Sequence, residues 1–393
     1  MRKVLIVDDD TAVTNHFLVF LVQTGMYDPL VSNDSREVEG LLERGKFDVV
    51  MLDMDMPDVS GMDILRVLRA KGDDTPVVVI TGVSDVDLAV RAMKLGAFDY
   101  LTKPVDGEAL LQVLENAIQH RTLRREIEDL PNRLTRKELA HEAAFQQLQT
   151  QDDRMIRLFH QAEKLAASDV SIFMCGERGT GKKALARAIH QASPRKEQQF
   201  IAIEAGRQDP ERFPVVFFGQ VKEWGGLREE TAGILDRADH GTIFIGCIEK
   251  ISLPMQVKLK RLILGGEYYR ENSTTIRNAD VRVIATSEHD LTRPEYAGKF
   301  SRDLLYHLMT HTLRIPPLRE RPGDIPLLAR RFLKEAAGLA GKEIGGFTED
   351  SMGILRRHAY PGNVKELEKI VSEAVAKEKA GSVTVESLPG YLT

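Results

Sequence analysis

The first part of the chain, up to about residue 121, repeats one pattern: a short apolar run stops at a polar residue, and an amphipathic stretch follows. Four such runs are clear, and a weaker one lies near Pro29–Ser32; the clear runs are Lys3–Asp8, Asp48–Asp53, Pro76–Thr81 and Phe98–Lys103. β-branched runs of this length, separated by helical segments, predict parallel strands that are buried on both faces. The pattern therefore predicts a five-stranded, doubly wound α/β sheet.

The polar residues that close these strands should meet at one edge of the sheet, where open parallel sheets place their binding sites. They are Asp8, Asp9, Asp53, Thr81 and Lys103. Three converging carboxylates repel one another unless a hard cation such as Mg²⁺ lies among them. The lysine and the threonine hydroxyl can bind a phosphoryl group, and Gly82 leaves room for it to enter. A single aspartate at a strand end usually caps a helix, but matches on several strands favour a phosphoryl site.

With these residues, the segment resembles the receiver domains of phosphorelay response regulators, here residues 1–121. The resemblance implies a phosphoacceptor, Asp53; a Mg²⁺ site of Asp8, Asp9, Asp53 and the backbone carbonyl of Asp55; a switch pair, Thr81 and Tyr100; and a phosphate-contacting lysine, Lys103. A cognate sensor histidine kinase or a phosphotransfer protein would supply the phosphoryl group. Its charge would alter the surface between Asp85 and Arg121, which we expect to contact a protein output partner.

A helical linker is predicted over residues 122–150. The last helix of the first domain should run from about Asp106 to Leu130, where the following proline stops it. Leu123, Ile127 and Leu130 repeat at spacings of four and three, which suits pairing with a second copy of the helix. A solvated helix with one apolar edge is the alternative. A homo-oligomer, dimer or higher, is therefore expected.

A second helix is predicted in the same linker. Thr135 and Glu138 have the spacing of a capping box, which favours a helix from there through about Gln151.

A second alternation of strands and helices begins near residue 151. The apolar run Val170–Cys175 leads into a glycine-rich loop made of Gly176, Glu177, Arg178, Gly179, Thr180, Gly181, Lys182 and Lys183. A strand before such a loop and a helix after it are typical of a P-loop, whose backbone N–H groups cradle phosphates. Lys182 would reach the β- and γ-phosphates of ATP, whereas Lys183 replaces the Ser or Thr that usually contacts Mg²⁺.

Six downstream segments carry a second resemblance: Phe200–Ala205, His240–Ile245, Met255–Ile263, Asp280–Ser287, Pro316–Ile325 and Tyr360–Val371. Together they resemble the AAA+ domain of NtrC-like, sigma-54-dependent transcription activators. The resemblance implies an AAA+ nucleotide-binding α/β subdomain over residues 151–313 and a helical subdomain over 314–393. Amphipathic stretches at Pro326–Leu339, Glu349–Arg357 and Val364–Lys379 independently predict the helices of the latter.

The sequence departs from this family where ATP hydrolysis takes place. Gly246 and Cys247 stand where active members carry Asp-Glu, and Glu288 stands where they carry a sensor Asn. Ser301 and His307 match the positions of two trans-acting arginines, Arg302 is one residue out of register, and Lys365 replaces a sensor arginine. We interpret the domain as one that binds ATP without efficient turnover. The alternative is an active sigma-54-dependent ATPase that has moved its catalytic carboxylate to Glu249 or Glu288.

Two further differences concern output. Residues Gln220–Gly233 lack the Gly-Ala-Phe-Thr-Gly-Ala sequence of working activators, and Trp224 within them is either an exposed contact or, more commonly for a lone tryptophan, packed. The chain stops where family members continue into a helix-turn-helix, and its net charge is only −5, so direct DNA binding is not expected. A phosphorylation-controlled interaction switch and a regulator that acts on RNA polymerase or forms mixed oligomers with an intact activator both remain open.

The remaining composition predicts a cytoplasmic protein. Cys175 and Cys247 lack metal-ligand spacing and are interpreted as free thiols. The first ten residues contain too many early acidic groups for a secretory signal, and no apolar run approaches the roughly 20 residues that span a bilayer.

Overall fold

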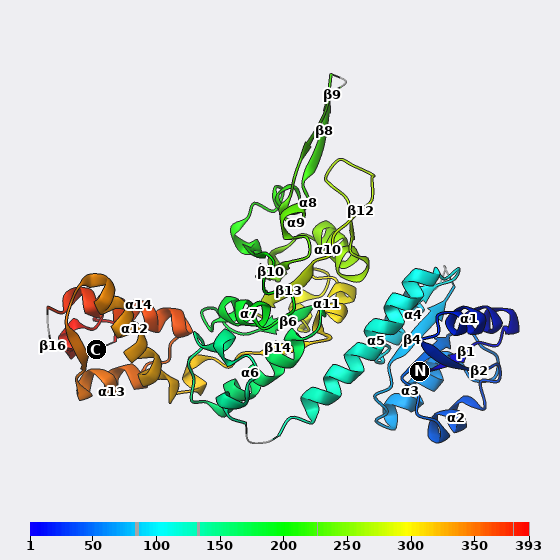
Figure 1. Ribbon diagram of the computed structural model, residues 1–393, viewed down its shortest axis with the longest axis horizontal. Coiled ribbons are helices and arrows are strands. Elements are labelled where there is room, and N and C mark those ends of the chain that lie inside the picture. The colour runs from blue at the N-terminus through cyan, green and yellow to red at the C-terminus, as the bar shows by residue number, and fades with distance from the viewer. Residues whose placement is uncertain (83–85, 132–133, 226, 380, 393) are drawn as a thin grey trace. The chain divides into compact units, whose positions relative to one another are not determined.

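The computed structural model describes the whole chain except residues 83–85, 132–133, 226, 380 and 393. Asp85, the first residue of the predicted output surface, therefore lies outside the described residues. The chain divides into two compact units, Met1–Asp129 and Leu130–Thr393 (Figure 1).

The first unit is a five-stranded parallel sheet with helices on both faces, as predicted. Its strands are β1 (Arg2–Val7), β2 (Tyr27–Ser32), β3 (Val49–Asp53), β4 (Val77–Thr81) and β5 (Asp99–Thr102), in the order β2-β1-β3-β4-β5. Its helices are α1 (Thr11–Gln23), α2 (Val38–Arg44), α3 (Gly61–Ala70), α4 (Val86–Lys94) and α5 (Gly107–Glu128). Alternate strand residues such as Val4, Met51 and Ile80 form one core with α1 and α5. The strand with the weakest sequence pattern, β2, is present at one edge of the sheet.

Helix α5 continues well past residue 121 and stays bonded to the first unit. Arg121 donates to the backbone oxygen of Phe47 at 2.5 Å and pairs with Asp74 at 3.0 Å. Arg125, one turn further on, pairs with the same carboxylate at 3.0 Å. The two arginines therefore hold the end of α5 against the sheet. Pairing of a second copy through Leu123, Ile127 and Leu130 stays a prediction.

The second predicted linker helix is wrong in its extent. The capping box of Thr135 and Glu138 is present, but it opens a short 3₁₀ helix, Arg136–Glu138, and a second one follows at Glu142–Phe145. Burial explains the break, because Phe145 is fully buried and its ring lies 5.4 Å from that of Phe159. Packing of this side chain outweighs the helical preference of the surrounding residues.

The second unit contains another five-stranded parallel sheet, in the order β14-β6-β13-β10-β7. Its strands are β6 (Ile172–Cys175), β7 (Phe200–Glu204), β10 (Thr242–Gly246), β13 (Arg282–Ser287) and β14 (Thr312–Arg314). The helices around it are α6 (Asp153–Ala166), α7 (Lys182–Gln191), α8 (Phe213–Phe218), α9 (Ile234–Ala238), α10 (Leu253–Gly265) and α11 (Arg302–Met309), and a short ribbon joins β11 (Glu267–Tyr268) to β12 (Arg277–Asn278). The predicted α/β architecture is confirmed.

A helical part follows the sheet, with its own apolar core of leucine, isoleucine, valine and alanine side chains. It consists of α12 (Asp324–Ala340), α13 (Glu349–Arg357) and α14 (Asn363–Lys377), with a small sheet of β15 (Ile344–Phe347) and β16 (Gly381–Val383). All three predicted helices are present, and each begins and ends within two residues of its expected bounds.

A two-stranded hairpin follows α8 within Gln220–Gly233 and projects from the second unit (Figure 1). Its strands are β8 (Gln220–Trp224) and β9 (Leu227–Thr231), paired antiparallel. Trp224 is 86% exposed and Leu227 75% exposed near the turn, so the packed alternative for this tryptophan is wrong. Gly226 lies outside the described residues.

Across the described parts of both units, no helix is both long and apolar enough to cross a membrane.

Candidate functional site

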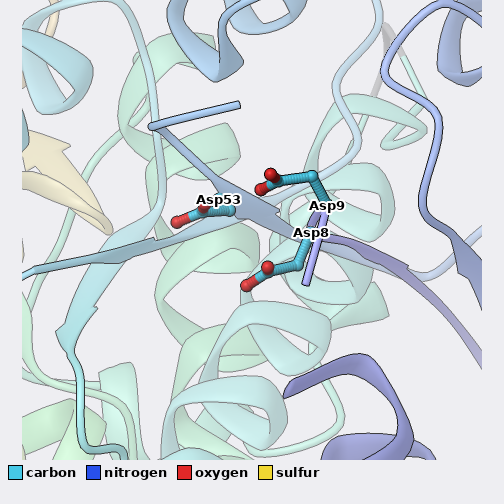
Figure 2. A group of neighbouring side chains, drawn as sticks. All are labelled: Asp8, Asp9 and Asp53. Atoms are coloured by element: carbon cyan, nitrogen blue, oxygen red, sulfur yellow. The ribbon is translucent and has the colours of Figure 1, made fainter. Parts of the chain in front are cut away.

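Three carboxylates gather at the carboxyl edge of the first sheet (Figure 2). Asp8 and Asp9 follow β1, and Asp53 ends β3, which is the neighbouring strand. One oxygen from each of the three lies within 4.8 Å of the others. We call this group the acid pocket. Asp8 and Asp53 are buried while Asp9 is exposed, so the pocket opens to solvent on one side. Oxygen ligands so arranged fit a hard divalent cation such as Mg²⁺.

Asp10, which directly follows Asp8 and Asp9 in the sequence, caps a helix. Asp10 is the N-cap of α1 and accepts a hydrogen bond from the backbone N–H of Ala12 at 2.8 Å. Its own backbone N–H donates to Asp8 Oδ1 at 2.9 Å. Helix capping, the ordinary role of a strand-end aspartate, thus falls to Asp10 and leaves Asp8 and Asp9 facing the pocket.

Lys103 supplies the positive charge of the pocket. Its Nζ lies 2.7 Å from Asp8 Oδ2 and 3.3 Å from Asp53 Oδ1. Partial burial acts to lower the pKa of Lys103, but the hydrogen bonds and charges of these two carboxylates outweigh it and raise that pKa. The pKa of Asp53 is raised, chiefly by burial and then by the charge of Asp8, against the opposing effect of Lys103. An unbound pocket therefore holds more negative charge than one lysine can balance.

The other predicted residues of this site lie around the pocket. Thr81 is buried at the end of β4, and its backbone oxygen accepts from the Lys103 N–H at 2.8 Å. Tyr100 lies half-buried on β5, next to β4. The side chain of Asp55 is exposed two residues after Asp53 and outside the carboxylate group. A Cβ at Gly82 would meet nothing within 4 Å, which leaves space beside Thr81.

The glycine-rich loop lies between β6 and α7, as a P-loop requires. Gly179 and Gly181 have φ angles of 78° and 105°, which favour glycine. Lys182 begins α7, and its Nζ donates to the backbone oxygens of Gly176 at 2.5 Å and Glu177 at 3.0 Å. Burial lowers the pKa of Lys182, although Glu288 and other acidic neighbours oppose this. Lys183 and Arg178 are exposed, whereas Thr180 is buried and donates to the Glu177 oxygen.

Residues that follow the second sheet in the sequence donate hydrogen bonds to this loop. Arg319 binds both carboxylate oxygens of Glu177, at 2.7 and 2.6 Å. Asn363, at the start of α14, donates to Glu177 Oε2 at 3.2 Å and to the Arg178 oxygen at 2.9 Å. The backbone approaches so closely that a Cβ on Gly179 would lie 2.1 Å from the oxygen of Gly362. Sequence reasoning missed these contacts, although the segments that contain Arg319 and Asn363 were singled out.

The end of β10 carries no acidic side chain. Gly246 closes the strand, and Cys247 follows with a φ of 55°. Burial raises the pKa of the Cys247 thiol to about 11, with a further contribution from the charges of Glu249, Glu288 and Glu204. The thiol is therefore neutral near pH 7. Both cysteines are free, as predicted.

Ser301 and His307, which stand where active family members carry arginines, both make contacts within this chain. Ser301 caps α11, accepts from the Leu304 N–H at 3.3 Å, and its N–H donates to Gln256 at 2.6 Å. His307 has a side chain only 8% exposed and lies 3.3 Å from Asp303. Arg302 is exposed beside them. Lys365 is also exposed and pairs with Glu368 at 3.1 Å.

One residue near this site was not among the sequence candidates. Glu204 ends β7 and pairs in register with Gly246 on β10. The rule that identified Asp8 and Asp53, a polar residue at the carboxyl end of a parallel strand, applies equally to Glu204.

Comparison with known families finds three domain models that match successive parts of the chain. The response regulator receiver domain matches residues 4–115, the sigma-54 interaction domain matches 148–314, and the AAA+ ATPase lid domain matches 319–393.

Relatives match over almost the entire chain. The response regulator protein PilR of Pseudomonas aeruginosa is 35% identical over 95% of this chain and 81% of its own length. The transcriptional regulatory protein ZraR of Escherichia coli is 33% identical over 98% of this chain and 85% of its own. Among solved structures, NtrX from Brucella abortus, crystallised in complex with ATP, has a TM-score of 0.56 at 26% identity and covers 99% of this chain and 84% of its own. The chain therefore belongs to the NtrC-like family of sigma-54-dependent response regulators.

Proposed function

We propose that this regulator is switched by phosphorylation of Asp53 and that its AAA+ domain binds ATP with Mg²⁺ without hydrolysing it efficiently. The observation that carries the proposal is a contrast between two strand ends. β3 ends in a buried carboxylate beside Asp8 and Lys103, whereas β10 ends in Gly246 and a neutral thiol. The first can act as a nucleophile toward phosphorus, and the second can neither hold a metal as a carboxylate nor polarise water.

At the acid pocket, an oxygen of Asp53 would attack the phosphorus of a phosphohistidine on a kinase or phosphotransfer protein. The P–N bond breaks as the P–O bond forms, and the histidine leaves. Mg²⁺, when bound, neutralises charge on the transferring group. Lys103 is close enough to Asp53 to pair with the phosphoryl oxygens, and Thr81 can donate to them from the next strand. The acyl phosphate adds about −1.5 to −2 charge at this edge, which Tyr100 and the neighbouring surface would transmit to a partner.

The nucleotide site retains its binding parts. The P-loop glycines have the required conformations, and Lys182 lies at the start of α7, where the helix N-terminus also favours phosphate. NtrX, a structural neighbour, binds ATP in its crystal structure. The trans-acting arginines are replaced by Ser301 and His307, and such arginines contribute about 10³–10⁵ in rate. Binding without efficient turnover is the outcome that these residues support.

A hydrolysis assay tests this proposal. Protein phosphorylated with a small phosphodonor is supplied with Mg²⁺ and ATP, and phosphate release is followed alongside Lys182→Ala. We expect both proteins to release phosphate at the same background rate. Turnover of about one per second that disappears in Lys182→Ala would contradict the proposal.

A second candidate, a working ATPase with a relocated carboxylate, has one specific observation in its favour. Oε2 of Glu249 is buried and has no hydrogen-bond partner among the described residues, and its charge acts on both Lys182 and Cys247. If this candidate is correct, turnover occurs in the wild type and is lost in Glu249→Gln.

The output is proposed to be an interaction with another protein or with a second copy of this chain. Mass photometry of the wild type and Asp53→Asn, each with and without ATP and phosphodonor, tests it. We expect assembly or release that depends on phosphodonor in the wild type alone. Identical mass distributions under all conditions would remove assembly as the output.

A further inference from the structure

The space that a side chain at position 246 would occupy is already filled by a carboxylate. β7 and β10 are parallel neighbours, and Glu204 and Gly246 share one register position at their carboxyl ends. A Cβ built on Gly246 would lie 1.9 Å from Glu204 Oε2, 2.4 Å from Cδ and 2.8 Å from Oε1. These distances are far below van der Waals contact. The Glu204 carboxylate and a residue-246 side chain are therefore mutually exclusive in this conformation.

We propose that Glu204 supplies the metal-side carboxylate of the nucleotide site, reaching from β7 into the place left by the glycine at the end of β10. The inference rests on the proposed function, since it presumes that the P-loop binds ATP with Mg²⁺. Glu204 is then a binding residue for Mg²⁺–ATP. It does not make the site an ATPase, because the next position is Cys247, whose thiol is neutral, and not a carboxylate able to orient water.

The surroundings of Glu204 support a role toward an external cation. Among the described residues, none donates a hydrogen bond to its carboxylate or pairs with it as a cation, and its side chain is half-buried. Lys182, a basic residue near the end of the loop, donates hydrogen bonds to the backbone oxygens of Gly176 and Glu177 and, within the described part of the chain, none to Glu204. A carboxylate that lies partly out of water without a partner is costly, and a divalent cation on a bound nucleotide would remove that cost.

Two other carboxylates lie in the neighbourhood but fit the role less well. Glu249 lies three residues beyond Gly246, in a 3₁₀ turn past the strand end, and its Oε2 is buried and inaccessible. Glu288 follows β13, and of the acidic groups that raise the pKa of Lys182 it acts most strongly. Of these three carboxylates, it is that of Glu204 whose atoms lie nearest to a Cβ on Gly246 in the described structure.

The test measures nucleotide affinity rather than turnover. Fluorescent mant-ATP is titrated into the full chain with Mg²⁺ and with EDTA, and the ratio of the two dissociation constants is the readout. In the wild type we expect Mg²⁺ to strengthen binding. In Glu204→Gln the ratio should fall at least about tenfold, the smaller of the losses seen on removing metal-site partners. Glu197→Gln, which removes an exposed carboxylate before β7, should keep the wild-type ratio.

A relocation variant separates a metal role from a merely structural one. Glu204→Ala combined with Gly246→Asp returns the carboxylate to β10 and removes the collision. This double variant should recover the Mg²⁺ dependence that Glu204→Ala alone loses, and circular dichroism establishes that each variant is folded.

Three results overturn the inference: an unchanged ratio in Glu204→Gln, a ratio lost in Glu249→Gln or Glu288→Gln instead, or a wild type that binds no nucleotide. Phosphate release recorded in the same samples keeps the two proposals apart. Turnover in the wild type would refute the hydrolysis deficiency while leaving the Glu204 result to be judged by the affinity ratio.

Discussion

The acid pocket and the nucleotide site lie at equivalent places on their sheets and differ in which strands supply their carboxylates. Both lie at the carboxyl edge of a five-stranded parallel sheet. In the first unit, adjacent strands β1 and β3 deliver Asp8 and Asp53, and Lys103 pairs with both. In the second, β10 delivers no carboxylate, and its neighbour β7 delivers Glu204 into the same space. A parallel sheet edge can thus receive a carboxylate from either of two neighbouring strands, because the strand register is fixed by the core beneath it.

The largest expected effect tests whether the acid pocket is the intact member of the pair. Asp53→Asn should abolish acyl-phosphate formation, since an amide is no nucleophile toward phosphorus. Intact-mass spectrometry after incubation with acetyl phosphate and Mg²⁺ measures this directly. Asp58→Asn, which changes an exposed aspartate in the loop after β3, is the matched control and should be phosphorylated normally. Equal phosphorylation of both variants would place the acceptor elsewhere.

The second effect tests whether the nucleotide site still binds. Lys182→Ala removes a charged donor at the P-loop and should weaken ATP binding by about 1.5–3 kcal/mol, or roughly 10- to 150-fold in Kd. Isothermal titration calorimetry measures it. Lys196→Ala, at an exposed lysine beyond α7, removes the same charge away from the loop and should leave Kd unchanged. If the two alanine variants bind equally, the loop is only a structural turn and the comparison fails.

Residues whose position follows from a nearby sequence pattern could be predicted, whereas residues whose role depends on contacts between distant segments could not. Asp8, Asp53 and Lys103 could be predicted because strand ends are readable from apolar runs and parallel strands bring their ends together. The helix expected from Thr135 to Gln151 failed because burial of Phe145 is a tertiary effect, invisible in capping and propensity. Glu204 was missed although it ends a strand, since its importance depends on the register between β7 and β10, which no single segment reveals.

A third effect tests how much the close contact between the P-loop and the helical part stabilises the second unit. Gly179→Ala places a Cβ 2.1 Å from the backbone oxygen of Gly362, so the helical part must move away from the P-loop. Gly341→Ala, at a similar positive φ of 62° but with nothing within 4 Å of its Cβ, incurs only the backbone strain. We expect Gly179→Ala to lower the free energy of unfolding of the second unit by about 1–3 kcal/mol more than Gly341→Ala. Denaturant titration measures both, and equal losses would show that this contact stabilises the unit little.

The smallest effect concerns the excess negative charge of the acid pocket, where three carboxylates lie together. The folded state raises the pKa of Asp53 through burial and the charge of Asp8, so the folded protein holds that proton more tightly than the unfolded chain. Asp53 therefore contributes less to stability as pH rises from its unfolded value of 3.8 through the raised folded value, and the loss is complete above that.

Without Mg²⁺ at about pH 7, Asp53→Asn should stabilise the first unit by about 0.5–2 kcal/mol, and the gain should shrink toward about pH 4. Millimolar Mg²⁺ should reverse the order, since only the wild type keeps all three carboxylates and gains stability by binding the cation. Thermal unfolding with and without EDTA measures all three conditions, and an Asn variant less stable than the wild type in EDTA would show that Lys103 already balances the pocket.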